Sequence, residues 1–164
     1  MTVSFDVSTG ADLQEVDNAV NQATREISNR FDFKNVLTEI EFDRAGHKVT
    51  IHTTDDFKLD AIWQVLAQRF RSRNIPLNNL KRGEVEKAGG NTVRQVIEII
   101  QAIDSDTARK IVKFIRDGKY KKVQPVIQGD EVRVSAPSRD EAQAVIADLR
   151  GADWGMELKF GNYR

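Results

Sequence analysis

The order in which strand-like and helix-like patterns recur constrains this chain more than any single motif. Apolar residues spaced by three and four positions predict four amphipathic helices, over residues 11–28, 55–71, 105–117 and 139–150. Alternating apolar residues predict strands between them, at residues 3–7, 39–42, 49–51, 77–82, 93–100, 123–128, 131–135 and 156–160. In chain order these elements form a βαββαβ unit twice, which predicts an α+β protein with antiparallel sheets.

The residues repeat as well as the elements. Residues 49–51 precede the second helix, and 83 positions later the similar residues 132–134 precede the fourth. In a ferredoxin-like βαββαβ unit the second strand lies at a sheet edge, where proline is tolerated because no ladder hydrogen bond is lost. Pro125 falls in that strand of the second copy. We therefore predict two tandem ferredoxin-like units, over residues 1–87 and 88–164. The linker between them is predicted around their boundary, at residues 83–91.

Composition excludes several classes of protein. The chain has 164 residues, of which 40% are hydrophobic and 30% charged, and this suits globular domains rather than a disordered chain. No apolar run approaches the roughly 20 residues that span a bilayer, and the first residues carry no secretory signal pattern. Cysteine is absent, which removes disulfides and thiolate chemistry. We therefore expect a cytoplasmic protein without membrane contact.

No pattern of catalytic residues emerges from the sequence. No serine lies in a nucleophile-elbow pattern, and Gly89 and Gly90 belong neither to a GxGxxG motif nor to a P-loop. The two histidines, His47 and His52, fall in one predicted hairpin without metal-ligand spacing. We therefore expect a binding protein rather than an enzyme, with no metal and no cofactor.

Charge is unevenly distributed, although the net charge is zero. Residues 1–60 carry 6 basic and 12 acidic side chains, whereas residues 105–122 carry 7 basic and 2 acidic ones. Arg109, Lys113 and Arg116 are spaced by four and three, which places them on one helix face. We call the basic residues of this segment the basic ridge: Arg109, Lys110, Lys113, Arg116, Lys119, Lys121 and Lys122. Such a ridge can neutralise phosphates without reading bases, but an ordinary solvated helix face fits the same pattern.

The predicted sheets lack the aromatic residues on which RNA-recognition modules of the same βαββαβ layout stack bases. The side chains expected on the solvent side of the sheets are Ser4, Asp6, Lys48, Thr50, His52, Arg94, Val96, Glu98, Glu131, Arg133 and Ser135. Sequence-specific stacking of RNA on the sheets is therefore disfavoured, whereas binding of phosphates or nucleotides stays open.

Several segments resemble the YajQ family of bacterial proteins. The first half is similar to the family at Ser4–Val7, Asp12–Val16 and the Asn-Arg-Phe-Asp-Phe-Lys stretch 29–34, and the second half at residues 110–113, 126–134 and 138–141. The closing residues Phe160–Arg164 resemble the last motif of the family. The family often has lysine where this chain has Pro137 and Gly161, so two positive charges are missing here.

The resemblance implies a fold and a function. It implies ferredoxin-like domains that exchange their first strands, with residues 3–7 in the second sheet and residues 92–100 in the first. It also implies a nucleotide-binding protein without catalytic activity, for which nucleic acid and cyclic di-GMP are ligands proposed in the family. We add Arg133 and Arg139 to the expected phosphate contacts, because both lie in matching segments. The expected partner is thus a nucleotide, cyclic di-GMP or RNA, bound without sequence specificity; a protein-interaction or regulatory module without a nucleotide ligand is the alternative.

Overall fold

The computed structural model describes residues 2–164. Its α-helices are α1 (Leu13–Ser28), α2 (Asp56–Ser72), α3 (Ser105–Asp117) and α4 (Arg139–Arg150). Its strands are β1 (Val3–Ser8), β2 (Thr38–Asp43), β3 (Lys48–Thr53), β4 (Leu80–Arg82), β5 (Glu86–Ala88), β6 (Thr92–Ile99), β7 (Gln124–Gln128), β8 (Glu131–Ala136) and β9 (Lys159–Gly161). Short 3-10 helices occupy Phe31–Phe33, Leu77–Asn79 and Gly89–Asn91. The predicted α+β class with two antiparallel sheets is confirmed over the described residues.

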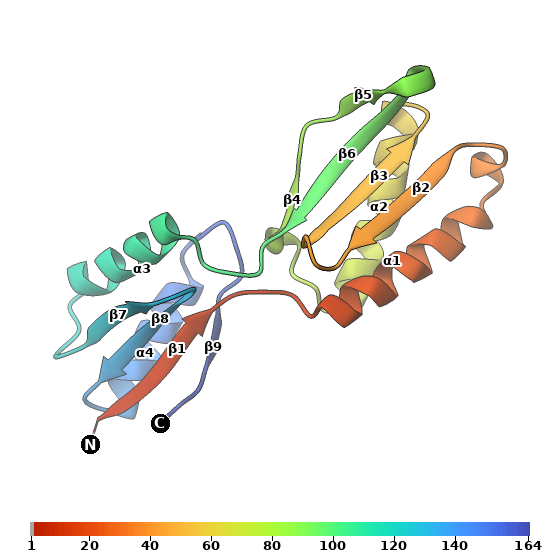
Figure 1. Ribbon diagram of the computed structural model, residues 1–164. Coiled ribbons are helices and arrows are strands. Elements are labelled where there is room, and N and C mark those ends of the chain that lie inside the picture. The colour runs from red at the N-terminus through yellow and green to blue at the C-terminus, as the bar shows by residue number, and fades with distance from the viewer. Residues whose placement is uncertain (1) are drawn as a thin grey trace. The chain divides into compact units, whose positions relative to one another are not determined.

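The chain forms two compact units, and each contains one sheet and two α-helices (Figure 1). The unit that we call the terminal unit combines the described residues up to Gly10 with Gln101–Arg164. The unit that we call the central unit is the continuous segment Ala11–Ile100. The first strand of the chain is therefore part of the same unit as the last 64 residues.

The sheet of the terminal unit has the strand order β7-β8-β1-β9, and β1 pairs antiparallel with β8 on one side and β9 on the other. Phe5 and Val7 of β1 are fully buried, whereas the alternate residues Ser4 and Asp6 are only partly buried. One face of the sheet therefore packs on the helices, and the other is open. Pro125 lies in the edge strand β7, where a residue without an N–H group leaves no strand unpaired.

The sheet of the central unit has the order β2-β3-β6-β4, and β5 also pairs with β6. β6 is thus bonded to three other strands. Val49 and Ile51 of β3 and Ile97 and Ile99 of β6 are buried together with the apolar faces of α1 and α2. Strand alternation and helix periodicity therefore bury complementary faces in one core.

A side chain caps the N-terminus of every α-helix in the described chain. The capping residues are Asp12, Asp55, Asp104 and Ser138. Asp12 accepts hydrogen bonds from the backbone amides of Gln14 and Glu15, so α1 begins at Leu13, two residues later than its apolar spacing predicts. The bounds of α3 and α4 agree with the predicted ones.

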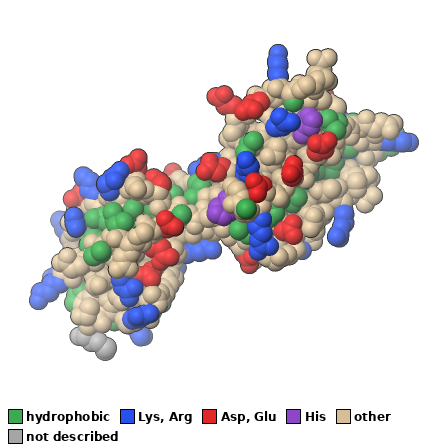
Figure 2. Space-filling view, in the orientation of Figure 1, with side chains coloured by type: hydrophobic (Ala, Val, Ile, Leu, Met, Phe, Trp, Pro, Cys, Tyr) green, Lys and Arg blue, Asp and Glu red, His purple; other side chains and the backbone are tan. Residues whose placement is uncertain are grey.

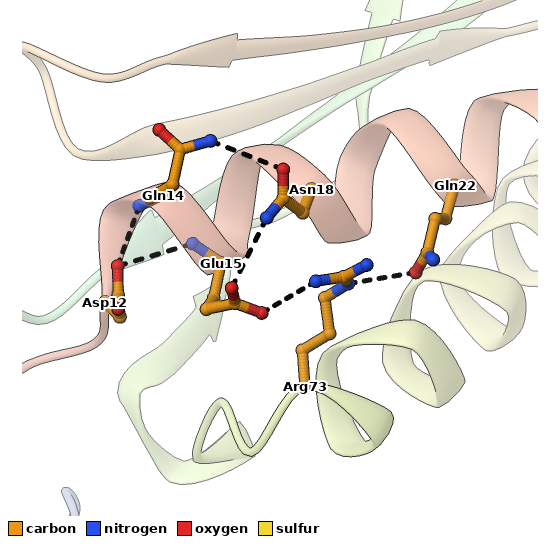
Figure 3. Close-up of polar contacts among 6 residues, drawn as sticks. All are labelled: Asp12, Gln14, Glu15, Asn18, Gln22 and Arg73. Carbon is orange, nitrogen blue, oxygen red and sulfur yellow. Dashed lines mark hydrogen bonds and ion pairs between the residues drawn. The ribbon is translucent and has the colours of Figure 1, made fainter.

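Arg73, which caps the C-terminus of α2, ties this helix to α1 (Figure 3). Its Nη1 lies 2.8 Å from Glu15 Oε2, and its Nε donates to Gln22 Oε1 at 3.0 Å. The Asn18 Nδ2 group donates to Oε1 of the same Glu15 carboxylate. The charged residues in this part of α1 and α2 thus have a structural role in the central unit.

Three stretches differ from the prediction. Residues 77–79, predicted as the first part of a strand over 77–82, form a 3-10 helix, and β4 begins only at Leu80. The segment 83–91, predicted to be a linker, contains β5 and lies inside the central unit, because its backbone pairs with β6 from Glu86–Arg94 to Ala88–Thr92. The last strand was expected over residues 156–160, but β9 begins only at Lys159. The Glu157 carbonyl accepts a hydrogen bond from the Thr9 hydroxyl at 2.6 Å, so this part of the segment is held by a side chain.

Candidate phosphate-binding site

Helix α3 carries the first part of the basic ridge on its exposed side. Its buried residues are Ala108, Ile111 and Ile115. Helical spacing therefore leaves Arg109, Lys110, Lys113 and Arg116 outside the core, and all four are exposed. Gly118 caps the C-terminus of α3. The exposed Lys119, Lys121 and Lys122 follow it, with Lys122 at a positive φ of 55°.

A groove of about 500 Å³ lies between α3 and the edge strand β7. Arg109, Lys113 and Arg116 line it from the helix. Its other lining residues are Val112, Asp117, Pro125, Val126 and Ile127. Val126 and Ile127 are 53% and 44% exposed, although both are large apolar residues. Figure 2 shows hydrophobic side chains over β7 and α3 with Lys and Arg side chains around them. The groove therefore combines an apolar floor with a basic rim.

The ridge cations differ in whether they have an acidic partner. Arg109 pairs with Asp106 one turn earlier, and Lys113 Nζ lies 3.2 Å from Asp117 Oδ2 one turn later. All four of these side chains are largely exposed, so the pairs contribute little stability and can open at small cost. Within residues 2–164, the other ridge residues, Lys110, Arg116, Lys119, Lys121 and Lys122, form no ion pair.

Tyr120 anchors the lysine-rich segment that follows α3. Its hydroxyl donates to Asp148 Oδ2 of α4 at 2.5 Å. Burial of the phenol, followed by this hydrogen bond, raises the pKa of Tyr120 to about 12. The hydroxyl thus stays protonated at neutral pH and keeps its hydrogen bond. This restrains the backbone between Lys119 and Lys121.

Two predicted contacts lie away from the ridge. Arg133 is on the open face of the sheet, where its Nη1 lies 3.3 Å from Asp6 Oδ1 and its Nη2 is 3.3 Å from Ser4 Oγ. Arg139 is the first residue of α4 and lines a different groove, together with Tyr163 and Arg164. The structure therefore brings Arg109, Lys113 and Arg116 together but not Arg133 and Arg139; the positive charge of Arg133 already faces a carboxylate.

The apolar floor of the ridge groove is the part that charge patterning missed. Val126 and Ile127 belong to a segment whose alternation predicts a strand, and apolar strand residues are ordinarily assigned to the core. The signal that could have found them is Pro125, because an edge strand has neighbours on one side only and leaves some of its apolar side chains uncovered.

We expect Asp104→Ala to lower the free energy of unfolding of the terminal unit by about 1 kcal/mol at pH 7, the usual cost of a lost N-cap. Asp104 accepts from the Thr107 hydroxyl at 2.6 Å and from the Thr107 backbone amide at 3.1 Å. These two bonds, the hydroxyl bond foremost, lower the pKa of the Asp104 carboxyl. A lowered pKa stabilises the fold above the unfolded-state value near 4 and this stabilisation fades as pH falls through the folded-state pKa.

Urea unfolding followed by Trp154 fluorescence checks this expectation, at pH 7 and again near pH 3. The difference between the natural sequence and Asp104→Ala should shrink at the lower pH. Ser105→Ala is the matched control, because Ser105 is the exposed next residue and no described residue bonds to its side chain. Equal destabilisation by both substitutions, or a difference that does not change with pH, would contradict a capping role for the Asp104 carboxylate.

Among residues 2–164, no three side chains of histidine, aspartate or glutamate gather closely enough to hold a metal ion. No helix in this part of the chain is both long and apolar enough to cross a membrane.

Comparison with known proteins identifies the family. A family model described as "Nucleotide-binding protein YajQ-like" matches residues 3–164. A protein of Koribacter versatilis named as a nucleotide-binding protein is 44% identical over 161 residues, which cover 98% of this chain and 96% of that protein. One from Bacillus cereus with the same description is 46% identical over 162 residues, covering 98% and 97%. The chain therefore belongs to the YajQ-like family.

Proposed function

We propose that this chain is a non-enzymatic nucleotide-binding protein whose terminal unit holds phosphate groups at the basic ridge. The observation that carries the proposal is the groove between α3 and β7, where three cations border exposed apolar side chains. The relatives' names, which call them nucleotide-binding proteins, support the ligand class. Nucleotides, cyclic di-GMP and RNA all present the phosphates that such a rim would bind.

The groove suits a ligand with one charged and one flat apolar part. Its volume of about 500 Å³ falls in the usual range of small-molecule sites, roughly 300–1,000 Å³. Arg109, Lys113 and Arg116 would contact the phosphates, and Val112 and Ile127, which is on the same sheet face as the buried Val132, would cover a base. Arg109 and Lys113 must then leave Asp106 and Asp117, which costs little because these pairs are exposed.

The remaining ridge lysines would extend the phosphate contacts beyond the groove. These are Lys110, Lys119, Lys121 and Lys122. Long exposed side chains of this kind contact a backbone of phosphates without reading bases, so we propose binding without sequence specificity. Arg133 would contribute only after leaving Asp6, and Arg139 belongs to a separate groove.

We propose, in addition, that the fold is a pair of ferredoxin-like units, 1–87 and 88–164, that exchange their first strands. We also propose that the protein is cytoplasmic. Exchanging residues 3–7 for residues 92–100 turns the first half into one continuous segment. That segment corresponds to the central unit, Ala11–Ile100, which supports the proposal. The pairing of β1 with β8 and β9, and of β6 with β3 and β4, supports it as well.

A titration with cyclic di-GMP, ATP, GTP and tRNA at two salt concentrations tests the function. We expect binding to weaken steeply with salt, because phosphate contacts release counterions. The triple variant Arg109→Ala/Lys113→Ala/Arg116→Ala should bind at least about tenfold more weakly and show a smaller salt dependence. The matched control is Lys48→Ala/Lys81→Ala/Arg94→Ala, which removes three exposed cations from the central unit. Absence of binding at low salt, or equal losses in both variants, would overturn the proposal.

The alternative function, a protein-interaction module without a nucleotide ligand, is favoured by one observation in the central unit. Phe31 and Phe57 are 89% and 79% exposed, although both are large apolar residues. The two lie on neighbouring segments, because Lys58 Nζ donates to the Asp32 carbonyl at 2.5 Å. A pull-down before and after nuclease treatment separates the two functions: a partner that persists after nuclease and is lost in Phe31→Ser/Phe57→Ser favours the interaction module.

A further inference from the structure

A second groove in the terminal unit lies away from the ridge, beside the closing residues of the chain. Its volume is about 460 Å³, and its lining residues are Val3, Arg139, Ala142, Gln143, Tyr163 and Arg164. The ridge groove borders β7 at one edge of the sheet, whereas residues 163–164 follow β9 at the other edge. The two grooves therefore share no residue and can be altered separately.

The groove holds two cations that have no acidic partner. Among residues 2–164, neither the Arg139 nor the Arg164 guanidinium forms an ion pair or a side-chain hydrogen bond. The N-terminus of α4 is capped by Ser138, whose hydroxyl accepts from the Glu141 amide at 3.2 Å, and the Arg139 side chain, which has donors only, takes no part in this cap. Two guanidinium groups on one groove repel each other unless an anion lies between them, and their planar donor arrays match a phosphate.

The backbone and one ring hold this groove in shape. Arg164 and Ser4 exchange two backbone hydrogen bonds, each 3.0 Å long, so the segment after β9 stays in register with β1. The Tyr163 ring lies 6.2 Å from the fully buried Phe5 ring, at an interplanar angle of 37°. Tyr163 is nevertheless 56% exposed. One part of the ring is thus packed while another is open for a flat group to stack on it.

We propose that this groove binds a phosphate ester that carries a flat aromatic ring, at a site distinct from the basic ridge. Arg139 and Arg164 hold the phosphate, and the ring stacks on Tyr163. Val3 supplies apolar surface, and the Gln143 amide can bond the polar edge of the ring. A phosphate ion alone would leave much of the 460 Å³ unfilled, whereas a nucleoside monophosphate fits its size and its mixture of groups.

The proposal rests on the proposed function for the class of ligand but not for the place where it binds. Two sources could supply the chemistry: a free nucleoside monophosphate, or the 5′-phosphate at the end of an oligonucleotide. Both present one phosphate beside one base, so both satisfy Arg139, Arg164 and Tyr163 in the same way. The experiment therefore includes a separate arm for each source.

The test maps amide shifts of the full chain by NMR during titration with AMP, with 5′-phosphorylated and unphosphorylated diadenylate, and with ribose 5-phosphate. We expect AMP to shift the amides of Gln143, Tyr163 and Arg164. Arg139→Ala/Arg164→Ala should weaken AMP binding at this site at least about tenfold. Tyr163→Leu should weaken AMP but leave the weaker binding of ribose 5-phosphate unchanged, because only the stacked ring is lost.

Control variants distinguish binding at this groove from binding at the basic ridge. Lys159→Ala removes an exposed cation of β9 that does not line the groove and should leave the affinity unchanged. The ridge triple variant should leave the AMP-induced amide shift of Tyr163 unchanged. This proposal can therefore succeed even if the basic ridge binds no ligand. Stronger binding of diadenylate only when it is 5′-phosphorylated would identify an RNA end as the source, and equal or stronger binding of AMP a free nucleotide. Failure of AMP to shift residues 139–143 and 163–164, or no effect of the double variant, would overturn the proposal.

Discussion

We expect a fragment comprising residues 11–100 to fold cooperatively, and a fragment comprising residues 1–87 to lack a cooperative transition. The first fragment contains every strand of the central sheet and both helices that cover it. The second lacks β6, to which β3, β4 and β5 are all bonded. It also loses the buried side chains Ile97 and Ile99, each worth roughly 1.5–3 kcal/mol when fully buried. Natural domains have a free energy of unfolding of only about 5–15 kcal/mol, so these losses are a large part of what holds such a domain folded.

Both fragments contain Trp63, so urea unfolding by fluorescence and by circular dichroism compares them with one reporter. The two fragments have nearly equal lengths, so a difference in their unfolding cannot be attributed to their size. We expect coincident sigmoidal transitions for 11–100 and a gradual change for 1–87. A sigmoidal transition in 1–87, or its absence in 11–100, would contradict the division of the chain at Gly10 and Ile100.

We expect Phe5→Ala to destabilise the terminal unit by about 3–5 kcal/mol, the usual cost of deleting a fully buried phenyl ring. Phe5 lies in β1 between β8 and β9, and its ring lies 6.3 Å from that of Phe160. The cavity left behind would be bordered by Phe160 and by Tyr163, both near the end of the chain. The substitution should therefore also loosen the groove that contains Tyr163.

Each unit has one tryptophan, so the loss can be assigned to a unit. Trp154 reports on the terminal unit, where its Nε1 donates to the Leu149 carbonyl at 2.8 Å, and Trp63 reports on the central unit. In Trp63→Phe and Trp154→Phe backgrounds, Phe5→Ala should shift only the transition seen by Trp154. Phe31→Ala is the matched control, because the same side chain is removed from an exposed position, where changes usually stay within about 0.5 kcal/mol.

The local elements could be predicted from the sequence because their signals are local. The bounds of α3 and α4 follow from apolar spacing between a cap, Asp104 or Ser138, and a glycine, Gly118 or Gly151. Apolar spacing predicts the start of α1 two residues too early, because Ala11 continues the apolar stripe while Asp12 caps the helix, which begins at Leu13.

The partners of a strand could not be predicted from alternation. Val3, Phe5 and Val7 require one buried face, but several sheets could supply it. The placement of residues 3–7 in the second sheet was implied only by family resemblance. The glycines and charges of the segment 83–91 predict a linker, because β5 there is a strand of only three residues with little apolar signal.

The candidate site was predictable in its charge and not in its shape. The spacing of Arg109, Lys113 and Arg116 on one helix face follows from helix geometry alone. Their apolar neighbours Val126 and Ile127 come from a strand, so the groove exists only after tertiary packing. Arg139 is expected among the phosphate contacts because it lies in a segment that matches the family, whereas packing places it in the groove beside Tyr163.

The position of β1 has a consequence for synthesis on the ribosome. The central unit is continuous and can fold as soon as Ile100 has emerged from the exit tunnel. β1 emerges before that unit, but its first partner β8 is made more than 120 residues later, a delay of roughly 6–25 s at typical elongation rates. During this interval Phe5 and Val7 belong to a segment whose strand partners have not yet been made, so their apolar side chains lack the core that covers them in the folded unit. These residues are therefore where we expect a nascent-chain chaperone to bind.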